Sequence, residues 1–176
     1  MTLKGTMGSE RLCAALLAKI HEQIEGTVHL ISAVPADRLN WTPAIPGAWP
    51  VDILLGHLLE CLAGFCAVLS AVEPKRLAHF SELRALPVNH ACSPGDAIRR
   101  IALYRTRIDE GFALLVDASL CKSVSTVFVR EGEPLLTLLL GNLEHLVNHK
   151  HQLFTYLRQL GVDVTTRDLY QFRGDV

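Results

Sequence analysis

The chain has 176 residues, which is enough for one well-filled core and too short to require two, so we expect a single domain spanning residues 1–176. The formal net charge is −1, with 17 basic and 18 acidic residues, which excludes the electrostatic footprint of a protein that binds nucleic acid or an anionic membrane. Hydrophobic residues make up 49% of the sequence and aromatic residues only 6%, a Leu- and Ala-rich balance that favours an all-α fold.

The cysteines and the N-terminus favour a soluble, cytoplasmic protein. The five cysteines are odd in number and lack the paired short spacings of a zinc ribbon or redox motif, so we expect reduced, mostly buried thiols. The first residues show no long apolar segment followed by a small-residue cleavage site, and no run reaches the roughly 18 apolar residues that span a bilayer.

Apolar residues at helical intervals predict a first helix that is capped by Ser9 and stopped by Pro35. His21 and His29 lie at the edge of its apolar stripe. A solvated or capping role is favoured for both over metal ligation.

Residues 35–50 form a connection punctuated by Pro and Gly that carries both tryptophans. We expect Trp41 to pack as a lid over one end of the core, whereas Trp49 is either a second lid or the wall of a pocket. A second helix follows over residues 50–72, with His57 in the middle of its apolar face. An isolated histidine there is typical of a core residue with one hydrogen bond, and ligation is the alternative.

The second half of the chain predicts two more helices. Residues 73–93 read as a long connection that covers one mouth of the bundle, and a third helix runs over residues 94–117. The valines within residues 119–134 predict an extended segment or short hairpin, and a fourth helix occupies residues 134–161 before a tail with one short turn. Four amphipathic helices with one long connection predict a four-helix bundle.

The fourth helix carries a histidine pair with the spacing of a metal site. His145 and His149 are four residues apart, so their side chains lie on one face, one turn apart, and the rest of that face is apolar. His151 points about 120° away from the pair, toward solvent or the flank. Together with His57 from another helix, the pair supplies the three ligands of an open metal site, although buried histidine pairs also occur without metal.

The chain resembles the DinB/YfiT-like superfamily of metalloenzymes over essentially its full length, and three passages carry the resemblance. WTPAIPGAWPVDILLGHLLE (41–60) is similar to the family's proline-glycine-x-tryptophan entry into a helix with a GHL-type histidine. EHLVNHKHQL (144–153) matches its H-x3-H-x2-Q-L pattern, and FTYLRQLGV (154–162) is similar to the end of its last helix. One departure is Pro50, where the family often has a Ser or Thr cap.

The resemblance implies a four-helix bundle with up-down-down-up connectivity and frequent dimerisation, so we expect a homodimer. It also implies a divalent metal ion held by His57, His145 and His149. Zinc or nickel is favoured, and iron or copper also suits three imidazoles.

Relatives in the superfamily imply a thiol-dependent S-transferase that uses a low-molecular-weight thiol, or a related metal-activated hydrolase. An ion with open positions lowers the pKa of a bound thiol or water, as both reactions require. Glu60, one turn from His57, is a candidate general acid/base or orienting group, and a solvated carboxylate is its alternative. Gln152 lies at the edge of the site or simply packs, and Cys61 is expected to be a small buried hydrophobe rather than a fourth ligand.

The competing interpretation is a non-catalytic protein. A metal that links the second helix to the fourth would then serve stability or a stress-associated binding role. A closed site would favour this structural role, whereas an open coordination position beneath a pocket would favour catalysis.

Overall fold

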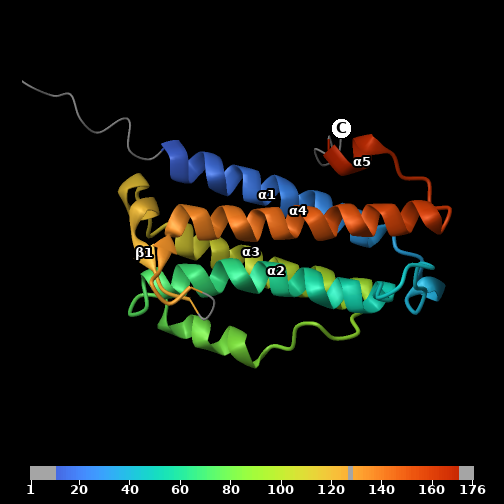
Figure 1. The fold of residues 1–176 in the computed structure, drawn as a ribbon, viewed down its shortest axis with the longest axis horizontal. Helices are drawn as coiled ribbons and strands as arrows, with labels where there is room; N and C mark the ends of the chain where they lie inside the picture. The colour runs from blue at the N-terminus through green and yellow to red at the C-terminus, as the bar shows by residue number, and fades with distance from the viewer. Residues whose placement is uncertain (1–10, 127–128, 171–176) are drawn as a thin grey trace, which may run out of the picture.

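The computed structural model describes residues 11–126 and 129–170, and most of them are helical (Figure 1). In these ranges the α-helices are α1 (Arg11–Ser32), α2 (Val51–Val72), α3 (Pro94–Phe112), α4 (Leu135–Gln159) and α5 (Thr166–Tyr170). Short 3₁₀ helices are η1 (Ala36–Arg38), η2 (Ala78–Ala85) and η3 (Asp117–Cys121), and the antiparallel strands are β1 (Ser123–Val124) and β2 (Glu133–Pro134). The predicted mostly helical fold is confirmed, as is the short hairpin before the last long helix.

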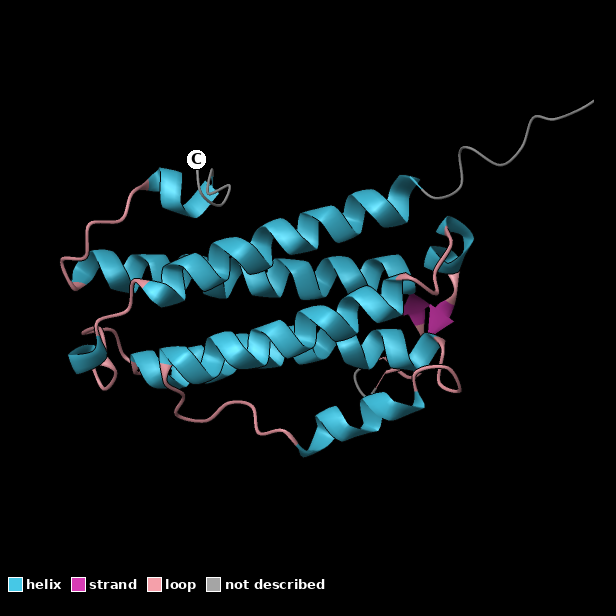
Figure 2. Ribbon diagram, turned by 180° about the vertical axis from the view of Figure 1, so that it is seen from behind, coloured by secondary structure: helices cyan, strands magenta, loops and turns pink. Residues whose placement is uncertain are grey.

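The four long helices lie along the long axis of the molecule (Figure 1). Helix α2 packs against α3 and α4, and α1 packs against the same two helices. The residues between them are mainly aliphatic and fully buried, and include Ile20, Ile24, Leu54, Leu58, Phe65, Tyr104, Leu139 and Leu157. Each such leucine or isoleucine contributes roughly 1.5–3 kcal/mol by burial. Figure 2 shows the connection from α2 to α3, including η2, running along the outside of the bundle.

Helix α2 corrects one expectation from the sequence. Its 22 residues include an 18-residue window with a mean hydropathy of 1.9, so it is long and apolar enough to cross a membrane. His57 and Glu60 interrupt the apolar run, but the mean hydropathy of the window remains high enough for a membrane-spanning helix. In the bundle, 61% of the window is buried, as is typical of the core helix of a soluble protein.

The end of the third helix also differs from the prediction. Helix α3 ends at Phe112 instead of near Asp117, because Asp117 belongs to the separate helix η3 and contacts α1. Its carboxylate accepts hydrogen bonds from the backbone N–H groups of Leu12 at 3.1 Å and Cys13 at 2.9 Å. These donors lie in the first turn of α1, so Asp117 caps that helix. The predicted cap Ser9 lies outside the described residues.

The two histidines of α1 bind carboxylates on other helices. Nε2 of His21 lies 2.6 Å from Oδ1 of Asp109 on α3, and Nε2 of His29 lies 2.8 Å from Oδ1 of Asp168 on α5. Neither histidine belongs to the candidate metal cluster, as predicted, but each is partly buried in a contact with another helix and is not simply solvated. Sequence periodicity placed these residues at the edge of the stripe, and that edge meets neighbouring helices.

A buried lysine fixes the short helix α5 against α1 and α4. Lys150 is only 3% exposed, and its ammonium donates to Oε1 of Gln23 at 2.6 Å and to the carbonyl of Leu169 at 3.0 Å. Burial lowers the pKa of this amine. The two acceptors offset part of the cost of burying it.

Candidate metal centre

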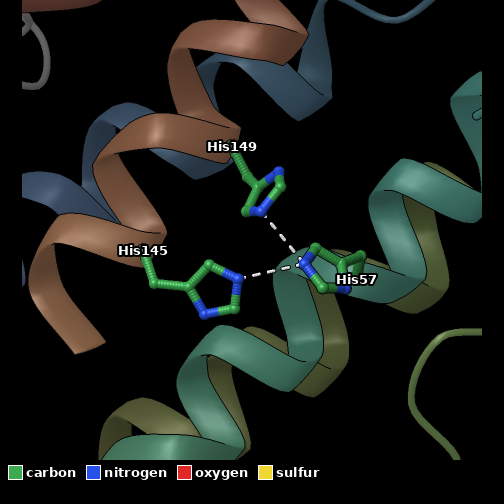
Figure 3. Close-up of side chains that lie close together, drawn as sticks. All are labelled: His57, His145 and His149. Atoms are coloured by element: carbon green, nitrogen blue, oxygen red, sulfur yellow. Dashed lines mark hydrogen bonds between the residues drawn. The ribbon is translucent and has the colours of Figure 1, made fainter. Parts of the chain in front are cut away.

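Three histidines from two helices converge in the groove between α2 and α4. Figure 3 shows His57 of α2 facing His145 and His149, which lie one turn apart on α4. Nε2 of His57 lies 3.1 Å from Nε2 of His145 and 3.0 Å from Nε2 of His149. One ligand atom from each residue lies within 4.8 Å of the others, and all three side chains are partly buried. The predicted trio is thus brought together.

The other ring nitrogens of two of these histidines face oxygen acceptors. Nδ1 of His57 lies 2.6 Å from Oδ1 of Asn89 and 3.0 Å from a carboxylate oxygen of Glu60. Nδ1 of His149 lies 2.8 Å from Oε1 of Gln152. Because a carboxylate and an amide oxygen can only accept, Nδ1 carries the proton in both rings. In the neutral form of each ring, Nε2 then has a lone pair.

This arrangement fits a metal ion. Two nitrogen lone pairs only 3.0 Å apart repel each other unless a cation lies between them. In a tetrahedral zinc site with bonds of about 2.0–2.1 Å, neighbouring nitrogens are about 3.3 Å apart, close to the two separations seen here. Acceptor oxygens on the outer nitrogens are the usual partners of metal-ligating histidines.

The surroundings of two of the rings disfavour their charged form. Burial lowers the pKa of His145 and of His149, and the neighbouring His57 lowers both further. The amide of Gln152 opposes this change at His149. A depressed pKa favours the unprotonated imidazole, which is the form that binds metal.

Asn89 reaches His57 because the chain crosses α2 at a glycine. The backbone N–H of Asn89 donates to the carbonyl of Gly56 at 3.2 Å. A Cβ atom on Gly56 would lie 2.0 Å from the carbonyl oxygen of His90, so only glycine permits this approach. Asn89 itself has a φ of 54°, a left-handed conformation that asparagine tolerates better than most residues. Sequence analysis missed Asn89, whose contact depends on this crossing.

The connection before α2 places one tryptophan on the cluster. The ring of Trp49 lies 4.6 Å from that of His57 and stacks on His149 at 5.8 Å, with 38% of the residue exposed. Of the two roles considered for Trp49, a wall of the site fits this contact. Trp41 packs edge-on against Tyr156 at 5.5 Å, and the hydroxyl of Tyr156 accepts from Nε2 of Gln152 at 3.0 Å. Trp41 thus packs on Tyr156, which in turn contacts Gln152, the partner of His149.

The remaining candidates separate clearly. Glu60 and Gln152 contact the outer nitrogens of His57 and His149, so each touches a candidate ligand. His151 is exposed and lies outside the cluster, as predicted. Cys61 is buried, and burial raises the pKa of its thiol to about 12, so it behaves as the small hydrophobe that we expected.

Comparison with known proteins supports the fold. No known protein family and no curated protein matches the chain. The structure is similar to the crystal structure of a DinB-like protein, YjoA, from Bacillus subtilis, with a TM-score of 0.63 and 18% sequence identity. The match covers 84% of this chain and 92% of the other. The chain therefore has a DinB-like fold, which agrees with the resemblance seen in its motifs.

Proposed function

We propose that His57, His145 and His149 bind one divalent transition-metal ion. The observation that carries this proposal is the convergence of three Nε2 atoms, two of them on rings whose outer nitrogens face acceptor oxygens. Zinc and nickel are the favoured ions, and iron or copper also suits three imidazoles. A chain with a DinB-like fold is consistent with such a site.

We further propose that the loaded protein is a thiol-dependent S-transferase or a related hydrolase. An ion held by only three protein ligands supplies a Lewis acid that lowers the pKa of a thiol or water in an open position. The protein contributes the fixed tautomers of His57 and His149 and the apolar wall of Trp49. Trp49 covers one side of the site, where its ring contacts His57 and His149.

The position of Glu60 supports a positioning role. Its carboxylate lies at Nδ1 of His57, on the side of the ring away from the other two histidines. There it fixes the tautomer and raises the basicity of Nε2. A role of Glu60 as general acid or base remains a prediction.

Metal content of purified variants tests the site. We expect about one equivalent of metal in the wild-type protein, and loss of most of it in His57→Ala and in His145→Ala. The matched control is His151→Ala, which removes an exposed histidine from the same helix as His145. Equal metal content in the wild-type protein and all three variants would refute the proposed site. For the activity, the loaded wild-type protein is then tested for conjugation of small thiols to a panel of electrophiles.

The competing function is a non-catalytic one, in which the metal fastens α2 to α4. The observation that favours it is that the ligands come from both of these helices, so an ion would bridge them. Removal of the metal would then lower the thermal stability, while the loaded protein would show no turnover with any thiol or electrophile. Turnover that disappears in His57→Ala would exclude the purely structural role.

Other features are proposed together with this function. The long connection between α2 and α3 supports an up-down-down-up connectivity, because a chain that returns along the bundle lets both helices run in the same direction (Figure 2). A homodimer, a cytoplasmic location, a low-molecular-weight thiol as partner, and the absence of nucleic-acid and membrane partners remain predictions.

A further inference from the structure

A second hollow lies between the same two helices, toward the hairpin. It has a volume of about 730 Å³, which is within the range of small-molecule sites. Helices α2 and α4 and the β1–β2 hairpin enclose it, and Figure 1 shows β1 beside the end of α2 and the start of α4. Small or aliphatic side chains form most of its lining, together with one arginine: Gly64, Ala67, Ala71, Arg84, Leu138 and Gly141. We call it the hairpin groove.

The hairpin groove approaches the histidine cluster along both helices. Gly64 follows His57 by two helical turns, so it lies on the same face of α2, about 10 Å along the axis. Asn142 precedes His145 by one turn on α4, and it also lines the groove. Gly64 and Asn142 face each other closely, since a Cβ on Gly64 would lie 2.5 Å from Oδ1 of Asn142. This pair forms the end of the groove that is nearer to the histidines.

The other end of the groove carries a charge. The side chain of Arg84, on η2, is exposed and has no hydrogen bond or ion pair to any described residue. It also lines an adjacent hollow that shares Ala67 and Ala71 with the groove, which places it near the C-terminal half of α2. Glu133 lines the groove from the hairpin, so an anionic ligand would have to approach Arg84 from the η2 side.

We propose that the hairpin groove binds an elongated small molecule with an aliphatic body and one carboxylate. The carboxylate pairs with Arg84, the aliphatic body lies along the small residues of α2 and α4, and the far end points toward the histidine cluster. A guanidinium presents several donors in a fork that matches a carboxylate. This inference goes beyond the proposed metal site, because the groove ends at Gly64 and Asn142, about 10 Å along α2 from His57.

Calorimetric titration with octanoate tests this inference. Gly141 lines the groove and has no atom within 4 Å of the position of a Cβ, so Gly141→Leu starts into open space, adds its side chain to the groove and also favours the helix. We expect Gly141→Leu to weaken octanoate binding by at least about tenfold, since a groove filled by leucine cannot bury the alkyl chain of octanoate. The matched control is Thr155→Leu, which adds a leucine at an exposed position of α4 outside the groove.

The charge is tested separately. Arg84→Gln should weaken octanoate by about tenfold and leave the binding of 1-octanol unchanged, because only the carboxylate uses the guanidinium. Tighter binding of octylamine than of octanoate would overturn the assigned class and point to Glu133 instead. Equal octanoate binding by the wild-type protein and Gly141→Leu would overturn the site itself.

Two further results keep this inference separate from the metal proposal. His57→Ala lacks a proposed metal ligand, yet it should bind octanoate as the wild-type protein does, because the groove does not use that imidazole. A wild-type protein that holds metal but does not bind octanoate would refute the groove alone. If a second copy of the chain covers the groove, Gly141→Leu will shift a dimer to monomer in sedimentation and octanoate will not bind, which also overturns the proposal.

Discussion

The backbone of His90 lies so close to Gly56 that we expect Gly56→Ala to weaken metal binding, although it changes no metal ligand. A Cβ at this position would lie 2.0 Å from the carbonyl oxygen of His90 and 2.8 Å from its nitrogen. Ordinary contacts between heavy atoms are roughly 3.5 Å, so the segment must retreat by about 1.5 Å. Asn89 precedes His90, and its Oδ1 lies only 2.6 Å from Nδ1 of His57. Such a shift takes this contact beyond the roughly 3.2 Å limit of a hydrogen bond.

The expected magnitudes follow from this displacement. Loss of one outer partner of a metal-ligating histidine typically costs 10- to 100-fold in affinity. We expect the lower value, about tenfold, because the carboxylate of Glu60 still faces the same nitrogen at 3.0 Å. Overpacking lowers the free energy of unfolding by about 1–3 kcal/mol, which corresponds to roughly 2–12 °C in Tm for a domain of this size.

Metal affinity by competition with a chelator, together with Tm, measures both effects. The matched control is Gly141→Ala, the same substitution on the facing helix at a position with open space, which should bind metal normally and gain up to about 1 kcal/mol. Asn89→Gly removes the amide but keeps the left-handed backbone, so it should weaken metal binding with little change in Tm. Wild-type metal affinity in both Gly56→Ala and Asn89→Gly would refute the reasoning.

Three more predictions concern residues of α4. Gln152→Ala should lower metal affinity by about tenfold by freeing the tautomer of His149, whereas Gln152→Glu should restore an acceptor and most of the affinity; equal affinities in all three proteins would contradict this role. Folding lowers the pKa of His145 and His149 below the usual histidine value of about 6.5. As the pH falls through that value, these side chains take up protons more readily in the unfolded chain than in the folded one, so the metal-free protein should lose stability. Urea unfolding at pH 7.5 and 5.5 measures this, and a variant with alanine at both positions should show a weaker pH dependence. Lys150→Ala leaves the buried carbonyl of Leu169 without its donor and should lower the free energy of unfolding by about 1–3 kcal/mol, measured by urea unfolding; an unchanged midpoint would show that the amine contributes no net stability.

The sequence predicts the histidine cluster because its signals are local. Spacing on one helix puts His145 and His149 on one face, and periodicity puts His57 on the face of a helix that packs against it. The family motif then joined the three. Asn89 had no comparable signal, because its contact requires a left-handed residue, a glycine on another helix, and a connection that folds back along the bundle.

The differences in the fold have the same origin. Asp117 reads as part of a helix in the sequence, but its carboxylate serves the first turn of α1, far away in the chain. The edge histidines of α1 likewise find carboxylates on α3 and α5. Periodicity shows which face of a helix is apolar, and it does not show which neighbouring helix meets the edge of that face.

The two halves of the candidate site differ in how they are held. On α4, His145, His149 and Gln152 follow one another at intervals of four and three residues, so a single helix sets both ligands and one tautomer. On α2, His57 depends on a partner from a connection that is kept in place by backbone contact at Gly56. A metal ion would join a half that α4 alone organises to a half in which one partner of His57, Asn89, comes from another part of the chain. Metal binding should therefore weaken when the connection is displaced, even while α2 and α4 remain helical, so Gly56→Ala and Asn89→Gly test this half of the site without removing a ligand.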